Sequence, residues 1–265
     1  MPLVQANGID LYYEETGNGE PLLLISGLSG NTLGWEPIRP ALAERFCAIS
    51  FDNRGAGRSS APPGPYSTRQ MADDAAALLD RIGVARAHVV GLSLGGMIAQ
   101  ELALAYPERV DRLVLLATYP RLRPGVHDPW LNAWLQAGER GMDPASFEIC
   151  MMPWMISPAF MARHDLVETA LVESLSDPYP ASAVGISGQV EACRAHDALE
   201  RLPQIAAPTL VLVGADDILS PLSYAQELTE RIPGARLQVL ERCGHVPFLE
   251  DPETVAETLL AFLAA

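Results

Sequence analysis

The chain has 265 residues, 49% of them hydrophobic, and a formal net charge of −15 at pH 7. This length and composition suit one domain with a complete apolar core. All 18 basic residues are arginine, which excludes a Schiff-base lysine, a pyridoxal phosphate linkage, a P-loop and a Ser-Lys dyad. The acidic excess argues against nucleic acid and anionic membranes as partners.

Nothing in the sequence indicates export or membrane insertion. The N-terminus has no basic segment followed by an apolar core, and no run approaches the roughly 18 apolar residues of a membrane helix. We therefore expect a cytoplasmic protein without a membrane partner. The four cysteines show no metal-type spacing, so neither a metal site nor a cofactor is predicted.

Strand and helix patterns alternate along the chain. Asn7-Gly8 separates two alternating apolar runs, which predicts an antiparallel hairpin at the edge of a sheet. A helix with one apolar face is predicted over 67–82. The other apolar runs predict strands at 22–25, 47–51, 87–90, 112–117, 209–213 and 237–240. This order favours an α/β fold with a mostly parallel, doubly wound sheet.

The segment 91–95 reads Gly-Leu-Ser-Leu-Gly and fits G-x-S-x-G between a predicted strand and a predicted helix. A tight strand-to-helix turn brings the backbone close to itself on both sides of the serine. Gly91 and Gly95 have no side chain and therefore leave the space that the turn needs at those two positions. The pattern predicts a nucleophile elbow with Ser93 as the nucleophile.

A serine nucleophile of this kind has its acid and its histidine downstream, in that order. His245 lies in a loop flanked by Gly244 and Pro247, after a predicted strand, where sheet enzymes hold catalytic groups. His88 precedes the serine in a buried strand and is better interpreted as a core imidazole. The remaining histidines, His127, His164 and His196, fall within a long central insertion.

The acid is expected in the loop after the strand at 209–213. Asp216 and Asp217 both lie there, and adjacent residues in a turn point to nearly opposite sides. The residues alone leave both aspartates as candidates.

Over nearly its whole length the chain resembles an α/β-hydrolase. The family's acid motif, Gly-x-x-Asp-x-x-x-Pro, is met by Gly214, Asp217 and Pro221, and the resemblance therefore implies Asp217 as the acid. The segment 52–59 is similar to the family's Asp-x-Arg-Gly-x-Gly-x-Ser turn. Its spacing fails G-x-G-x-x-G because Ser60 stands at the third glycine, so a structural turn is predicted there.

About ninety residues separate the strand at 112–117 from the strand at 209–213, far more than a crossover needs. This insertion resembles the helical cap of many α/β-hydrolases. We expect a core of residues 1–117 and 206–265 and a cap of residues 118–205, with Pro124 and Pro203 as candidate hinges. The cap is rich in tryptophan and methionine, which form adaptable apolar walls. The residues expected to contact substrate are Met151, Met152, Trp154 and Met155.

Two backbone amides are expected to stabilise an oxyanion. One belongs to Leu94, directly after the nucleophile, and the second to Leu28, in the loop after the strand at 22–25. Ser26-Gly27-Leu28 departs from the family's common His-Gly-x pattern. Enol-lactonases of aromatic catabolism also carry serine there, so the chain resembles that group in particular.

The sequence thus predicts a serine hydrolase that cleaves a carboxylic ester or lactone of a small, largely apolar substrate through an acyl-enzyme. An enol-lactonase is the leading specific alternative. A cofactor-free perhydrolase uses the same triad, and a small-molecule sensor that retains the triad is a further alternative. A dehalogenase or epoxide hydrolase would need aspartate in place of Ser93.

Overall fold

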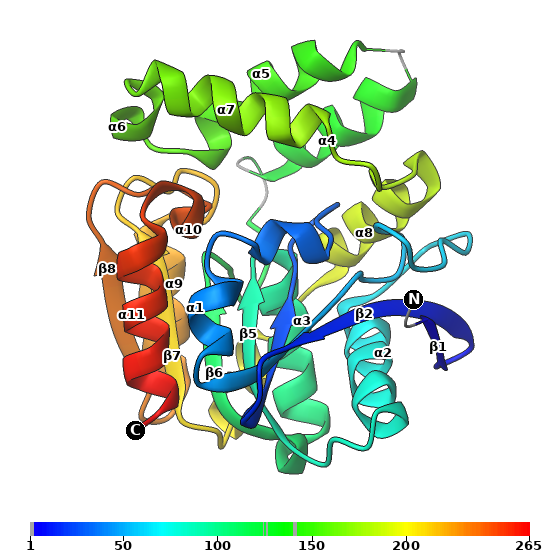
Figure 1. Ribbon diagram of the computed structural model, residues 1–265, viewed down its shortest axis with the longest axis vertical. Coiled ribbons are helices and arrows are strands. Elements are labelled where there is room, and N and C mark those ends of the chain that lie inside the picture. The colour runs from blue at the N-terminus through cyan, green and yellow to red at the C-terminus, as the bar shows by residue number, and fades with distance from the viewer. Residues whose placement is uncertain (1–2, 124, 126, 140–141) are drawn as a thin grey trace.

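The computed structural model describes residues 3–123, 125, 127–139 and 142–265 (Figure 1). One eight-stranded sheet, in the order β1-β2-β4-β3-β5-β6-β7-β8, forms its centre. Its strands are β1 (Leu3–Ala6), β2 (Ile9–Thr16), β3 (Glu20–Ile25), β4 (Phe46–Phe51), β5 (Ala87–Leu92), β6 (Val110–Leu116), β7 (Thr209–Gly214) and β8 (Arg236–Leu240).

The N-terminal hairpin is confirmed. Asn7 and Gly8 have φ angles of 47° and 79°, as a type I′ turn requires, and Ala6 pairs with Ile9 across it. β2 pairs antiparallel with β4, whereas β4, β3, β5, β6, β7 and β8 are all parallel neighbours. The carboxyl ends of these parallel strands therefore meet at one edge of the sheet.

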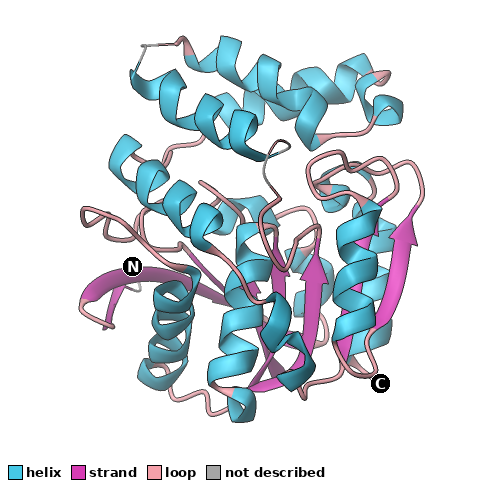
Figure 2. Ribbon diagram, turned by 180° about the vertical axis from the view of Figure 1, so that it is seen from behind, coloured by secondary structure: helices cyan, strands magenta, loops and turns pink. Residues whose placement is uncertain are grey.

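Helices cover both faces of the sheet, as expected (Figures 1 and 2). Alternate strand residues point to opposite faces, so Leu23 and Val89 join one apolar cluster while Leu24 and Val90 join another. The first cluster includes α2 (Thr68–Arg81), α3 (Leu94–Ala105) and α9 (Leu222–Arg231), and the second includes α1 (Arg39–Ala43) and α11 (Pro252–Leu263). Within the described part of the chain, none of the helices is both long and apolar enough to cross a membrane.

Residues 118–205, the cap segment, leave the sheet after β6 and return at β7. Figure 1 shows residues 127–175, which form α4 to α7, as a layer beyond one end of the sheet. Trp130, Met151 and Val190 of this segment belong to the same apolar cluster as α2 and α3, so its packing is continuous with the core. Pro203 lies within the short helix η3 (Leu199–Gln204), and Pro124 lies outside the described residues. The segment contains α4 (His127–Glu139), α5 (Pro144–Met155), α6 (Pro158–Met161), α7 (His164–Leu175), α8 (Ala183–Ala195) and η3 (Leu199–Gln204).

His196, which follows α8, is buried where the cap segment meets α2. Its Nδ1 lies 3.0 Å from Oγ1 of Thr68, and its Nε2 has no hydrogen-bond partner among the described residues. Burial lowers the pKa of His196 from 6.5 to about 3. Glu101 lies 4.0 Å away but is already bound by Arg201, so it does not offset this burial. The ring is therefore neutral in the folded protein.

Acid should weaken the fold through His196. The unfolded chain takes up this proton near pH 6.5 and the folded chain only near pH 3, so stability is complete above pH 6.5 and is lost as the pH falls through this window. His196→Phe should cost about 1 kcal/mol at pH 7 through the lost hydrogen bond. Below pH 6.5 the unfolding free energy of the variant should fall less steeply than that of the wild-type protein. The two slopes should differ by up to about 1.4 kcal/mol per pH unit. Urea titrations of both proteins at pH 7, 5.5 and 4.5 measure this, and parallel pH profiles would contradict it.

Candidate active site

Ser93 stands alone between β5 and α3 in a strained backbone conformation, with φ 53° and ψ −116°. A Cβ at Gly91 would lie 2.3 Å from the carbonyl oxygen of Gly95, and a Cβ at Gly95 would lie 2.0 Å from that of Ile25. Only glycine fits either position. The tight strand-to-helix turn predicted from the spacing is present.

The backbone of Ser93 is held on both sides. Its amide donates to the carbonyl of Leu116 at 2.9 Å, and its carbonyl accepts from the amide of Gly96 at 2.9 Å and from Oγ1 of Thr118 at 2.7 Å. These bonds hold the backbone of the serine and involve no atom of its side chain. Thr118 had no signal in the sequence, because its role depends on the neighbouring strand β6.

His245 and Asp217 form a buried pair. Nδ1 of His245 donates to Oδ2 of Asp217 at 2.9 Å, which leaves Nε2 as the acceptor of the neutral ring. The other carboxylate oxygen accepts from the amides of Leu219 and Ser220, at 2.9 and 2.7 Å. Asp216 is exposed. Of the two aspartates that the sequence left open, Asp217 is the one that meets the histidine.

The loop after β3 lies beside Ser93. A Cβ at Gly27 would be 3.4 Å from Cβ of Ser93, and Leu28 follows directly. On the other side, Leu94 is the first residue of α3, where an amide has no partner within the helix and the helix dipole favours negative charge. The two predicted amide donors thus lie in segments that flank Ser93.

Ser26 stands where the family commonly carries histidine. Its hydroxyl accepts a hydrogen bond from Nε1 of Trp35 at 2.9 Å and donates one to the carbonyl of Asn31 at 3.1 Å. The second bond closes the loop over residues 26–31, and the first ties this loop to Trp35. The side chain of Ser26 therefore shapes this loop.

Two other buried groups near the site, the His127 imidazole and the Cys243 thiol, are poorly suited to act as a base or a nucleophile. His127 at the start of α4 donates from Nε2 to the carbonyl of Leu219 at 2.9 Å, and burial lowers its pKa. Burial also raises the pKa of Cys243, two residues before His245, to about 11, so its thiol stays protonated at neutral pH. Among the described residues, no group of three or more His, Cys, Asp or Glu side chains could hold a metal ion.

The four cap residues predicted to contact substrate lie on α5. Met151 is buried in the first apolar cluster, the one that includes α2, α3 and α9. Trp154 and Met155 are half-buried against the same cluster. Met152 is also half-buried. The carbonyl of Met155 accepts a hydrogen bond from the amide of Val246 at 3.1 Å, so the end of α5 touches the loop that carries His245.

Glu250, in α10 (Pro247–Glu250), joins the same loop to the cap segment. Its carboxylate accepts from the amide of Gly244 at 2.7 Å, from the amide of Ser157 at 3.2 Å and from Oγ of Ser157 at 2.5 Å. Burial raises the pKa of Glu250 although these donors favour its ionised form. This contact could not be predicted from the sequence, because Ser157 and Glu250 are 93 positions apart.

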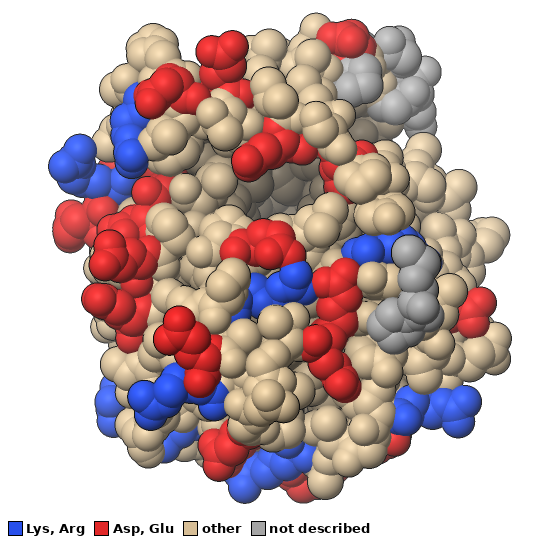
Figure 3. All heavy atoms as spheres, viewed as in Figure 1, with Lys and Arg blue, Asp and Glu red and all other residues tan. Residues whose placement is uncertain are grey.

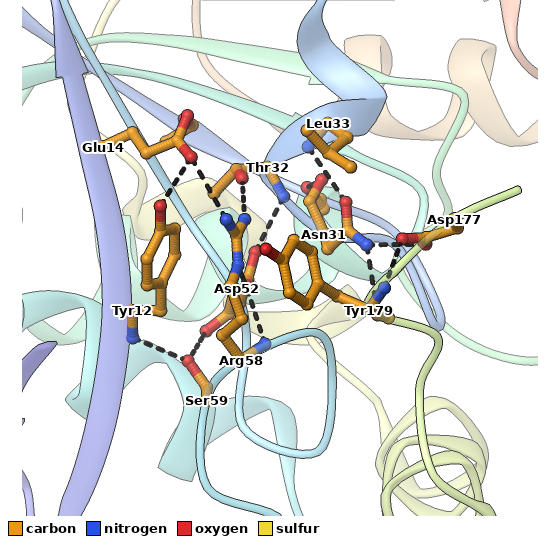
Figure 4. A network of polar contacts seen from close by, with 12 residues as sticks. Tyr12, Glu14, Asn31, Thr32, Leu33, Asp52, Arg58, Ser59, Asp177 and Tyr179 are labelled. Atoms are coloured by element: carbon orange, nitrogen blue, oxygen red, sulfur yellow. Dashed lines mark hydrogen bonds and ion pairs between the residues drawn. The ribbon is translucent and has the colours of Figure 1, made fainter. Parts of the chain in front are cut away.

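The turn at 52–59 is structural, as predicted, and Figure 4 shows how it is held. Asp52 accepts from the amide of Thr32 and from the amide of Arg58, both at 2.8 Å. The guanidinium of Arg58 stacks between two rings, 3.5 Å from the centroid of Tyr12 and 4.3 Å from that of Tyr179. Because Tyr179 belongs to the cap segment, this stack fastens the cap to the sheet.

The molecular surface is hollowed between the cap layer and the core. Figure 3 shows this hollow with acidic side chains along its rim. Acidic residues at a rim disfavour anionic ligands and tolerate neutral or cationic ones.

The sequence profile described as the alpha/beta hydrolase family matches residues 22–258. Among curated proteins, the chain is similar to one from Azorhizobium caulinodans named as a carbamate hydrolase, RutD. The two are 34% identical over 99% of this chain and 98% of that protein.

Two solved structures are also similar. The enol-lactonase from Burkholderia xenovorans shares 28% identity, with a TM-score of 0.90 and 100% of both chains covered. A thermophilic esterase from Thermogutta terrifontis shares 29% identity, with a TM-score of 0.88 over 100% of this chain and 98% of that one.

The contacts of Glu250 generate a prediction about the loop that carries His245. Glu250→Ala leaves the buried amides of Gly244 and Ser157 without an acceptor, and each buried unpaired donor costs about 1–3 kcal/mol. We expect lower stability and faster amide hydrogen exchange over residues 244–246, measured by mass spectrometry.

Asp251→Ala is the matched control for this change. Asp251 caps α11 through the amide of Thr254 at 3.1 Å, so its loss should cost about 1 kcal/mol without affecting residues 244–246. Unchanged exchange at Gly244 in the Glu250 variant would contradict the assigned contact.

Proposed function

The chain belongs to the alpha/beta hydrolase family, and we propose that it is a serine hydrolase that cleaves a carboxylic ester or lactone through an acyl-enzyme. One observation carries this proposal. Ser93 occupies the strained turn after β5, and the buried His245–Asp217 pair comes from the loops after β8 and β7, at the same edge of the sheet. The candidate nucleophile, base and orienting acid thus come from three loops at this one edge.

In the proposed mechanism, Nε2 of His245 takes the proton of Ser93 as the hydroxyl attacks the acyl carbon. Asp217 holds the imidazole through Nδ1 and stabilises the cation that forms. The protonated ring then gives its proton to the leaving alcohol. Water attacks the acyl-enzyme in the second half of the reaction, again with His245 as the base.

The tetrahedral intermediates carry negative charge on the former carbonyl oxygen. We assign the amides of Leu94 and Leu28 as its hydrogen-bond donors, because the segments that carry them flank Ser93. The position of Leu94 at the start of α3 adds the positive end of the helix dipole.

We propose that Met152, Trp154 and Met155 contact the substrate, with Met151 packed behind them. Support comes from the end of α5, which lies against the loop of His245. Thioether and indole side chains make an apolar wall that adapts to small acyl or alcohol groups.

The cap arginines favour a neutral substrate over a carboxylate-bearing enol-lactone, which would need a cationic clamp. Arg163 lies exposed beside Phe160, and Arg140 lies outside the described residues. The other four are engaged by acidic side chains: Arg121 with Asp197 at 4.0 Å, Arg123 with Glu227 at 2.8 Å, Arg194 with Glu191 at 2.9 Å and Arg201 with Glu101 at 2.8 Å. A neutral ester is therefore our first choice, and an enol-lactone or a carbamate is the alternative for a substrate panel.

Ser93→Ala tests the nucleophile. The folded variant should lose roughly a million-fold in turnover of a neutral ester, as serine hydrolases do without their nucleophile. A fluorophosphonate should label Ser93 in the wild-type protein, with the modified peptide identified by mass spectrometry. A label elsewhere, or a variant that keeps a tenth of the activity, would refute the assignment. Turnover that depends on peroxide would favour a perhydrolase, and ligand binding without turnover would favour a sensor.

The two aspartates provide a second, internally controlled test. Asp217→Asn should lower turnover roughly ten-thousand-fold, because an amide favours the wrong imidazole tautomer. Asp216→Asn changes an exposed neighbour and should cost under about tenfold. Steady-state kinetics of both variants on the same ester decide the matter. The reverse order, or two equally small effects, would show that Asp217 does not orient His245.

A further inference from the structure

Gln189 of α8 is a fully buried polar side chain that joins two loops of the core. Its Oε1 accepts from the amide of Ser29 at 2.8 Å, and its Nε2 donates to the carbonyl of Arg54 at 2.8 Å. Both bonds go to backbone atoms. Each loop is thereby fixed in position by a residue that lies more than a hundred positions away in the sequence.

The loop at Ser29 needs such support. The amide of Gly30 donates to the carbonyl of Gly27 at 3.2 Å, which closes a turn with Leu28 and Ser29 at its centre. Ser29 has φ 61°, and a positive φ at the second central residue is a conformation that normally selects glycine. A serine holds it only where the surroundings stabilise it. Gln189 binds the amide of the peptide that joins Leu28 to Ser29, and so fixes the plane of that peptide.

Gln189 is itself rigidly placed. A Cβ at Gly185 would lie 1.8 Å from the carbonyl oxygen of Gly55, and one at Gly188 would lie 2.4 Å from the ring of Tyr66. The backbone of α8 is therefore pressed directly on the core. A side chain from a helix so tightly docked has little freedom to move.

The far end of the loop is held in the same way. Nδ2 of Asn31 donates to Oδ2 of Asp177 at 2.7 Å, while its Oδ1 accepts from the amide of Leu33 at 2.9 Å (Figure 4). Asp177 belongs to the cap segment. The loop 27–31 is thus held at Ser29 and at Asn31 by residues that the insertion supplies.

We propose that Gln189 is a positioning residue for the oxyanion hole: by binding the amide of Ser29 it aims the preceding amide of Leu28 at the substrate oxygen. This role rests on the proposed serine hydrolase function. In this role α8 supports the reaction by holding the loop 27–31 in position, without touching the substrate.

Gln189→Met tests the role, because methionine keeps the volume and removes both hydrogen bonds. Gln100→Met is the matched control. Gln100 is an equally buried glutamine on α3 whose Nε2 donates to the carbonyl of Tyr119 at 3.1 Å, away from the loop 27–31. Gln189→Glu is the conservative variant, since a protonated carboxyl in this buried place reproduces one acceptor and one donor.

Three readouts are compared for each protein: kcat and KM for a neutral ester, inhibition by a boronic acid that forms a tetrahedral adduct with a serine nucleophile, and amide exchange of residues 27–31. Gln189→Met should lower kcat about tenfold, less than the hundredfold or more lost with a whole oxyanion donor. The boronic acid should bind more weakly by a similar factor, with KM nearly unchanged and exchange at Ser29 faster. Gln189→Glu should recover most of the loss.

Gln100→Met removes one hydrogen bond where Gln189→Met removes two, so it should lower the melting temperature by less and leave kcat unchanged. If Gln189→Met keeps wild-type kcat, or loses activity only as much as the control does, the proposal is overturned. Failure of the proposed function is separate, because it would appear as wild-type protein that neither fluorophosphonate nor boronic acid modifies. In that case the exchange of Ser29 alone decides whether Gln189 holds the loop, and unchanged exchange would overturn the proposal.

Discussion

The backbone at Ser93 is the constraint on which the rest of the site depends. With φ 53° and ψ −116°, this residue lies outside the regions that an L-amino acid adopts at low cost. The strain is compatible with a stable fold because Gly91 and Gly95 allow β5, α3 and β3 to approach within contact distance, and because Leu116 and Thr118 bind the serine backbone. The same approach brings the loop after β3 beside the serine side chain.

The other parts of the site are held through the cap segment. His127 binds the loop of Asp217 at Leu219, Met155 binds the loop of His245 at Val246, and Gln189 binds the loop of Leu28 at Ser29. These insertion residues therefore do more than cover the site. Each adds a hydrogen bond between the cap segment and a loop that carries a candidate site residue.

The sequence was informative where the structure follows from a local pattern of residues. G-x-S-x-G between an apolar strand and a helix predicted the turn at Ser93, and Asn7-Gly8 predicted the hairpin. The choice of Asp217 over Asp216 needed the resemblance, because which side a turn residue faces depends on contacts with the next strand.

The contacts that hold the loops could not be predicted from the sequence. Gln189 lies 160 positions from Ser29, and Glu250 lies 93 positions from Ser157. A hydrogen bond between such distant residues leaves no periodicity and no composition bias. Buried glutamine and glutamate read as ordinary helix residues until their neighbours in space are known.

The cap contacts to these loops are made largely with main-chain atoms, namely the amides of Ser29 and Val246 and the carbonyl of Leu219. Main-chain groups are the same whatever side chain is attached. Side chains on α5 can therefore change without altering these hydrogen bonds. Such an arrangement is well suited to a family in which proteins about one-third identical carry different substrate names.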